Sequence, residues 1–317
     1  MAQKFNRTYL LKVDVDPTTI IGDAANANGI SPLPQNTETI TMPFTCEFTV
    51  TREVLAQSST ATIRIYNLSQ PTRDRLYKDP FWSTQKRYLE FYAGYLGQSK
   101  QEGFMPRIFY GLLLSCTSWR EGVNTITEFQ ATSMAFDVPN ADDNLTVTAG
   151  QTAKEVLRRL NARMPGINPE PIIGDSFATV TYPKAFVLSG KVWQSIRMVS
   201  NGLAVVDNNT MTALNDNEAV TSTIPLINSA SGIIGTPKRG QFGVEVTLIF
   251  EPRFTLQQVV QLQSTFNQNL SGTYKVYGFK HTGIISPRVG GNLQTNVTLF
   301  RPGLNYDPFV IQPSPAV

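Results

Sequence analysis

Alternation of apolar and polar residues recurs along most of this chain and predicts many short β-strands. From residue 44 to residue 50 every second residue is apolar, and the residues between them are two threonines and one glutamate. Residues two apart share one face of a strand, so this pattern is typical of a half-buried strand. The same pattern predicts strands over 8–16, 61–68, 87–95, 108–118 and 125–131.

The strand-rich first part also contains one helical signal and one break in periodicity. Ser69 is a candidate N-cap for a short helix ending at Tyr77, with Pro71 in its first turn. From residue 21 to residue 43 the alternation disappears and Gly, Asn, Ser and Pro accumulate, so we expect a long loop excursion. Five or six strands with one helix predict a closed or nearly closed barrel, because closure removes exposed sheet edges.

Helical periodicity replaces alternation after about residue 140. Thr152 and Glu155 form a capping-box pattern, followed by an apolar stripe at helical spacing. A second helix is predicted to start at Ser189 and to end at the Asn-Gly pair 201–202. Two short strands follow, and Asn208-Asn209 between them predicts a tight turn. This part therefore predicts a small α/β domain.

Strand alternation returns in the last third of the chain. Apolar residues at every second position from Val244 to Phe250 share one face, and those from Leu293 to Leu299 share another. We therefore expect a mainly β, α+β protein with two tube-like antiparallel barrels and a small α/β domain between them. The predicted domains are 1–140, 141–222 and 223–317, with an irregular tail after Arg301. Cys46-Glu-Phe-Thr-Val50 and Val244-Glu-Val-Thr-Leu248 share the pattern apolar-Glu-apolar-Thr-apolar, which is a weak sign that the barrels are related.

Charge is sparse, which bears on the partners that this chain can have. Charged residues make up 16% of the 317 residues, against about 25% in an average soluble protein, and the net charge is +3. Basic residues occur at most in adjacent pairs such as Arg158-Arg159 and Lys238-Arg239, too few to predict tight nucleic-acid binding. Low charge density favours a subunit of an assembly, and a surface rich in Asn, Gln, Ser and Thr is the alternative reading.

The cysteines, the first residues and the lengths of the apolar runs indicate the cellular compartment of this chain. Cys46 and Cys116 lie in strand-like segments, so we expect buried free thiols, and no spacing predicts a metal site or a cofactor. The first residues lack the apolar core of a signal peptide, and no run approaches the roughly 18 apolar residues that span a membrane. We therefore expect synthesis in a cytosol and no membrane insertion.

Candidate chemistry is scarce, and we predict no enzyme. His281 is the single histidine, and we expect it at the rim of a barrel, with a base or contact residue as the alternative. Asp142-Asp143 falls in a turn-forming composition, for which calcium is the alternative reading. Trp193 lies on an apolar helical stripe and is expected in the core. Phe81 and Trp82 follow a proline and are the candidate interface residues.

The order of these features resembles the baseplate hub proteins of contractile phage tails, the late control protein D or tail hub family. The similar segments are Ser59–Ser69 with the helix behind it, Phe186–Leu214, Ile234–Pro237, Phe250–Arg253 and Gly272–Gly283. The resemblance covers most of residues 44–300. The excursion at 21–43 and the tail after residue 301 are not part of that pattern.

This resemblance implies a structural subunit that forms a homotrimer in which each chain contributes two barrels. Three chains then imitate six, so that a pseudo-sixfold ring joins the hexameric tail tube to the trimeric central spike. The implied partners also include other baseplate proteins, and genomic DNA passing through the channel without sequence-specific contacts. The implied location is the tail baseplate of a virion assembled in the bacterial cytoplasm. Two other functions stay open: a tail-associated cell-wall hydrolase, and a receptor- or carbohydrate-binding β module that uses Trp82.

Overall fold

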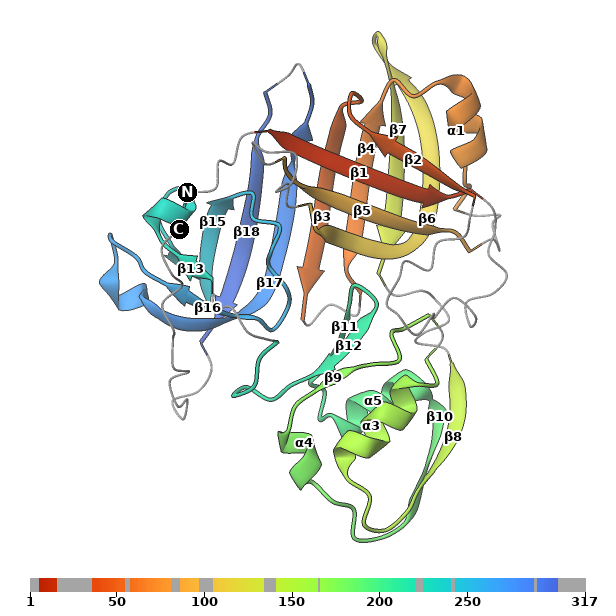
Figure 1. The fold of residues 1–317 in the computed structure, drawn as a ribbon, viewed down its shortest axis with the longest axis vertical. Helices are drawn as coiled ribbons and strands as arrows, with labels where there is room; N and C mark the ends of the chain where they lie inside the picture. Colours follow the sequence, from red (N-terminus) through yellow and green to blue (C-terminus); the bar gives the residue numbers. More distant parts are fainter. Residues whose placement is uncertain are drawn as a thin grey trace.

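A computed structural model describes residues 6–15, 36–54, 58–80, 86–96, 105–133, 141–164, 166–220, 225–240, 243–287 and 290–301. Two curled sheet regions lie side by side, and a smaller region with most of the helices lies next to both (Figure 1). The described strands form one 13-stranded sheet, one two-stranded sheet and one three-stranded sheet. The predicted mainly β fold with few helices is therefore confirmed.

Seven strands are described in the first region, and alternation predicted six of them. They are β1 (Arg7–Asp14), β2 (Thr37–Thr41), β3 (Cys46–Glu53), β4 (Thr60–Tyr66), β5 (Tyr88–Tyr95), β6 (Arg107–Glu121) and β7 (Asn124–Thr132). The expectation of an irregular excursion over 21–43 is wrong for β2, which pairs antiparallel with β1. Only Ile40 is buried in β2, so its sequence lacks the alternation that marks the other strands. Residues 21–35 of the excursion lie outside the described residues.

The first region packs its strands in two layers around one hydrophobic core. β1 and β5 cross over β3 and β4 (Figure 1), so side chains from both layers meet. The ring centroids of Phe48 and Phe91 lie 5.0 Å apart in an edge-to-face arrangement. Phe250 from the last third of the chain extends this cluster, with its centroid 6.0 Å from that of Phe48.

Among the described residues of the first region there is one short helix, as predicted. Helix α1 spans Gln70–Leu76, and its N-cap Ser69 accepts a hydrogen bond from the backbone N–H of Thr72. Leu76 is fully buried and anchors the helix against the core.

The middle region combines short strands with helices. Its elements are β8 (Asp142–Val147), α3 (Ala153–Asn161), β9 (Ile172–Ile173), α4 (Ser176–Thr179), β10 (Phe186–Lys191), α5 (Val192–Val199), β11 (Ala204–Asp207) and β12 (Thr210–Ala213). β8 pairs with β10, while β11, β12 and β9 form the three-stranded sheet. Helices α3 and α5 pack together over this framework (Figure 1).

Local signals in the middle region are mostly confirmed. Thr152 Oγ1 accepts from the N–H of Glu155 at 3.2 Å, and Glu155 Oε2 accepts from the N–H of Thr152 at 2.9 Å, which completes the capping box. The predicted helix start at Ser189 is wrong. Ser189 lies in β10 opposite Asn144, and α5 begins three residues later, because strand pairing with β8 competes with the helix. Asn208 and Asn209 form the predicted tight turn, with φ values of 44° and 71°.

The last region is again rich in strands. Its elements are β13 (Leu226–Ile227), β14 (Lys238–Arg239), β15 (Val244–Ile249), β16 (Val259–Leu262), β17 (Gly272–Ile285) and β18 (Leu293–Phe300), with short 3₁₀ turns η1 (Ser229–Ser231) and η2 (Gln268–Leu270). The predicted apolar faces of β15 and β18 are buried. Residues 302–317, where the irregular tail was expected, lie outside the described residues.

The first and last regions repeat one pairing pattern. In the first, β3 pairs with β4, β4 with β7, β7 with β6, and β6 with β5. In the last, β14 pairs with β15, β15 with β18, β18 with β17, and β17 with β16. Both sets of five strands follow the same order along the chain. In this pattern β15 corresponds to β4, so the sequence echo between the Cys46 and Val244 segments joins strands that are not equivalent.

The two regions also share one continuous sheet. β17 pairs with β16 at its start and with β3 over Gly278–Ile285, which joins the two sets of strands edge to edge. The resulting order is β14-β15-β18-β17-β3-β4-β7-β6-β5-β1-β2. Within the described residues no pairing closes either set of strands on itself, so the closed barrels expected from the sequence are not found there, and the strands form one open, curled sheet.

Candidate functional site: a continuous polar face and the junction behind it

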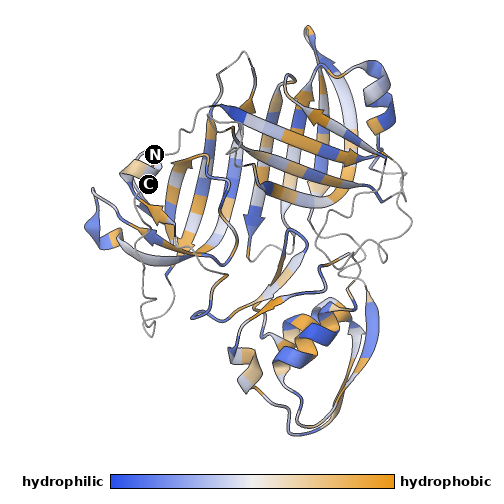
Figure 2. Cartoon of the chain, viewed as in Figure 1, coloured by the Kyte–Doolittle hydropathy of each residue, from blue (hydrophilic) through white to orange (hydrophobic). Residues whose placement is uncertain are grey.

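One face of the shared sheet is polar across both regions. A row of side chains crosses five strands in register, from Gln294 through Thr282, Thr49 and Thr62 to Gln130. None of the five is buried, and none carries a charge. The next row contains Asn296, Lys280, Thr51, Thr60 and Thr132. Hydrophilic and hydrophobic bands alternate along these strands in Figure 2, as expected for a sheet with one solvated face. We call this surface the polar face.

Charges on the polar face are few and lean acidic. Its basic side chains are Arg64, Lys238 and Lys280, and its acidic side chains are Glu47, Glu53, Glu121, Glu128 and Glu245. Arg64 Nε donates to Glu128 Oε2 at 2.7 Å, so one of the three cations is already paired. A polyanion such as DNA therefore meets little attraction on this surface.

The opposite face of the same sheet is dry. The row behind the polar face runs through Thr295, His281, Val50, Ala61 and Ala131, and all five residues are buried. The expected rim position of His281 is therefore wrong, because this residue lies in the middle of a long strand, with strands paired on both sides.

The hydrogen bonds of His281 indicate its tautomer, and its burial determines its charge. Thr295 Oγ1 accepts from the N–H of Glu251 at 3.0 Å and lies 2.8 Å from His281 Nδ1. The threonine hydroxyl can donate to Nδ1, which leaves the proton of a neutral ring on Nε2, and Nε2 has no partner among the described residues. Burial, and secondly the charge of Arg52, lower the pKa of His281 to about 3. The ring is thus neutral at pH 7 and closed to any substrate.

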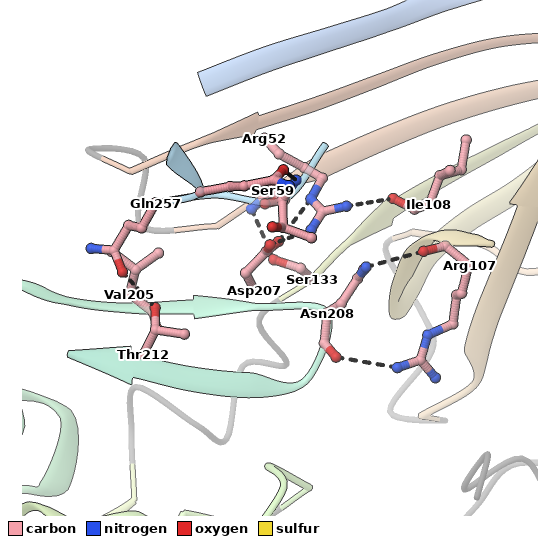
Figure 3. Close-up of polar contacts among 12 residues, drawn as sticks. Arg52, Ser59, Arg107, Ile108, Ser133, Val205, Asp207, Asn208, Thr212 and Gln257 are labelled. Carbon is pink, nitrogen blue, oxygen red and sulfur yellow. Dashed lines mark hydrogen bonds and ion pairs between the residues drawn. The ribbon is translucent and has the colours of Figure 1, made fainter. Parts of the chain in front are cut away.

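A polar junction lies beside this dry face, where the three regions meet (Figure 3). Arg52 Nε donates to Asp207 Oδ1 at 2.7 Å, and a second, shorter contact joins the guanidinium to Asp207 Oδ2. Arg52 also donates to the carbonyl of Ile108 at 3.2 Å, and its guanidinium carbon lies 4.8 Å from the centre of the Phe279 ring. The guanidinium of this β3 residue therefore contacts β6, β11 and β17 together.

The turn and flanks of the β11–β12 hairpin complete the junction (Figure 3). Asn208 Nδ2 donates to the carbonyl of Arg107, and Arg107 returns a hydrogen bond to the carbonyl of Asn208, both at 3.2 Å. Thr212 Oγ1 donates to Gln257 Oε1 at 2.9 Å. Val205 belongs to the hydrophobic core of the last region. The hairpin is therefore fixed to both sheet regions, which sets the orientation of the middle region.

The other residues that the sequence singled out as candidates do not lie together in the structure. Phe81 and Trp82 lie outside the described residues. Asp142 and Asp143 are not in a turn: they begin β8, where they pair with Lys191 at 2.9 Å and with Arg163. Trp193 is buried, as predicted.

The other expectations concern thiols, metals and membranes. Cys46 and Cys116 are buried free thiols, as predicted. In the part of the chain that the structure describes, no cluster of three or more His, Cys, Asp or Glu side chains could hold a metal ion. No helix among those residues is long and apolar enough to cross a bilayer.

Sequence reasoning missed the residues of the junction. Arg52 occupies an inward position of the alternating strand 46–52, and a charged residue at a buried position was the available signal. Its partner Asp207 is 155 residues away and could not be identified from spacing.

Comparisons with known proteins agree on one class. The chain shares its fold with a tail protein from Neisseria meningitidis MC58 at a TM-score of 0.55 and 10% identity, covering 92% of this chain and 96% of the other. A 43 kDa tail protein of prophage MuSo2 from Shewanella oneidensis gives a TM-score of 0.57 at 8% identity, covering 94% and 97%.

A third similar structure is the c3393 protein of E. coli, a type VI secretion component described as similar to the T4 bacteriophage tail proteins gp27 and gp5. It gives a TM-score of 0.52 at 7% identity, covering 85% of this chain and 78% of the other. At these identities the structural matches show the fold alone. No curated protein matches the sequence. The family model for baseplate hub gp41 matches residues 29–282, which confirms the resemblance in the sequence, and this chain therefore belongs to the baseplate hub gp41 family.

Proposed function

We propose that this chain is a structural subunit of the hub, and that three copies form a ring that joins the tail tube to the central spike. The observation that carries this proposal is the repeated pairing pattern within one sheet, in which β3 to β7 match β14 to β18. One chain thus presents two comparable sheet units in a fixed arrangement. Three chains present six such units, which matches a hexameric tube on one side and a trimeric spike on the other.

The geometry of the repeat supports closure of the ring. The two units are joined edge to edge by β17 and β3, so their arrangement is head to tail. Head-to-tail contacts generate a ring when the rotation between copies closes. The barrel-like shape expected for each unit and the domain limits 1–140, 141–222 and 223–317 belong to this proposal, as does an interface role for Phe81 and Trp82.

The polar face is proposed to line the channel. A channel that conducts DNA must not retain it, and retention grows with the number of phosphates that lysine and arginine neutralise. The row from Gln294 to Gln130 is uncharged, and the face as a whole has more acidic than basic side chains. This composition supports passage of DNA without sequence-specific contacts, in a baseplate assembled within the bacterial host.

Mass photometry of the purified chain over a range of concentrations tests the proposal. We expect a species of three copies, alone or after addition of the tube and spike proteins. A chain that stays monomeric in the presence of both partners would contradict the ring.

A further inference from the structure

The two sheet units of one chain are joined by pairing of β17 with β3. The described residues of one chain contain no equivalent pairing at the other edges of the two units. The long strand β17 has two sections separated by a bulge at Val276/Gly278. Its first section pairs with β16 over 272–275, and its second section pairs with β3 over 278–285. On its other edge β17 pairs with β18 from Lys275 to Gly283, so the end of the first section and most of the second section have strand partners on both sides.

The corresponding strand β6 has the same two sections but lacks the second partner. Its first section pairs with β5, and it carries a bulge at Leu113/Ser115 against β7. Beyond the isolated bridge of Cys116 to Lys78, residues 117–121 pair with β7 alone within the described chain. An edge of backbone groups is thus left open on one side of β6.

The far end of the sheet has the complementary feature. β14 corresponds to β3 and pairs with β15, and its outer edge has no strand partner among the described residues. A pocket of about 340 Å³ opens beside it, lined by Arg239, Tyr277 and Phe300 among others. At the equivalent place in the first unit, Val50 of β3 is fully buried in a filled core. Among the described residues, no further strand covers β14 or closes the pocket beside it.

We propose that residues 117–121 of β6 in one copy pair antiparallel with residues 236–240 around β14 of a second copy. This contact would continue the shared sheet from copy to copy, and it rests on the ring proposed above. It also names the surfaces that close the ring.

The repeat defines the register of this contact. Ser115 directly follows the bulge in β6, and Gly278 directly follows the bulge in β17, so these two residues occupy equivalent positions. Four residues further along each strand, Trp119 is therefore equivalent to Thr282. Thr282 lies opposite Thr49 of β3.

The position that matches Thr49 in the last unit follows from the pairings across each sheet. Ser115 pairs with Gln130 and Gly278 pairs with Thr298, so Gln130 matches Thr298. Gln130 pairs with Thr62 and Thr298 pairs with Glu245, so Thr62 matches Glu245. Thr62 in turn pairs with Thr49, and Glu245 pairs with Lys238. Lys238 therefore matches Thr49, and Trp119 of one copy lies opposite Lys238 of the next.

Side-chain chemistry at these positions is complementary. Trp119 and Lys238 are both exposed in the single chain. An ammonium group over an indole ring is a favourable cation–π contact. Glu121 is two residues from Trp119 on the same face and becomes a diagonal neighbour of Lys238, which adds an opposite charge. Pro237 lacks a donor, which suits the edge strand of a short ladder.

A cysteine pair tests the register directly. Directly opposite residues of antiparallel strands bring their Cβ atoms close enough for a disulfide. The full chain with Trp119→Cys and Lys238→Cys is oxidised and run on a non-reducing gel, where we expect interchain products up to three linked copies. The matched control combines Arg120→Cys with Lys238→Cys. A shift of one residue places this pair on opposite faces, so we expect at least tenfold less product.

Charge reversal tests the proposed contact independently of the disulfide. We expect Lys238→Glu to raise the dissociation constant of the assembly at least tenfold and Glu121→Lys in the same chain to restore it, whereas Lys154→Glu on α3 leaves it unchanged. Assembly by mass photometry without a specific disulfide and without a charge effect would overturn this contact and leave the ring standing. Absence of both assembly and disulfide would overturn the contact and the proposed function together.

Discussion

Arg52 and Asp207 form a buried ion pair, although 155 residues separate them along the chain. Their side chains are 3% and 10% exposed. Arg52 belongs to the strand that joins the two sheet units, and Asp207 belongs to the hairpin of the middle region. This pair therefore couples the placement of the middle region to the edge-to-edge junction on which the proposed ring depends.

Removing one member of this pair should destabilise the chain strongly. Arg52→Met leaves the Asp207 carboxylate buried without its partner, for which we expect a loss of about 3–5 kcal/mol in the free energy of unfolding. The double variant Arg52→Met/Asp207→Leu should recover most of that loss, because no charge then stays buried. Urea denaturation of both variants measures the difference. Lys191→Met, which breaks the more exposed pair with Asp142, serves as the control, and an equal loss there would contradict this account.

His281 should make stability depend on pH. Its pKa is lowered from an ordinary value of 6.5 to about 3 in the folded chain, so the unfolded chain binds the extra proton between these values. The stabilisation is complete above pH 6.5 and is lost as the pH falls towards 3, with a slope of about 1.4 kcal/mol per pH unit for one proton.

Urea midpoints between pH 7.5 and pH 5 test this dependence. The variant His281→Gln keeps a hydrogen-bonding group near Thr295 but has no titratable ring, so its midpoint should change less over the same range. Equal pH slopes for the variant and the parent chain would show that His281 is not the group responsible.

The capping box of α3 should contribute measurably to stability. Thr152→Ala removes the side-chain acceptor for the N–H of Glu155, and we expect a loss of about 1 kcal/mol in the free energy of unfolding. Thr152→Ser keeps the hydroxyl and should stay close to the parent chain. A serine variant as unstable as the alanine variant would rule out the cap as the cause.

New lysines on the polar face should make the assembled hub retain DNA. Thr62→Lys and Gln130→Lys lie on adjacent strands of the uncharged row, so copies of both would gather around the proposed channel. The dependence of binding on salt should steepen by about one unit of log K per log salt for each phosphate neutralised.

The matched control places the same charges away from the polar face. Thr146→Lys and Ser189→Lys lie on exposed positions of β8 and β10 in the middle region. Filter binding of duplex DNA at several salt concentrations compares the two pairs. An equal effect of both pairs would argue against a channel at the polar face.

Local elements of this fold were predictable because their signals are local. Alternation identified β3, β4, β15 and β18, and side-chain caps identified α1 and α3. β2 was missed because Ile40 is its single buried residue. The start of α5 was misplaced because Phe186–Lys191 has a strand partner in β8 that is 39 or more residues away.

Relations between distant segments were not predictable from one sequence. The pairing of β17 with β3 joins residues more than 220 positions apart, and no local pattern specifies it. His281 was expected at a rim because the segment around it reads like a strand end, whereas the strand continues to Ile285 between two partners. The polar face and the repeated pairing pattern became visible only once these registers were known.

An electron cryomicroscopy reconstruction of the purified hub assembly tests the central claim most directly. The account predicts a ring of three chains with six similar sheet units, in which the row from Gln294 to Gln130 points into the channel. A ring whose polar face points outward, or copies that pack without closing a ring, would contradict it.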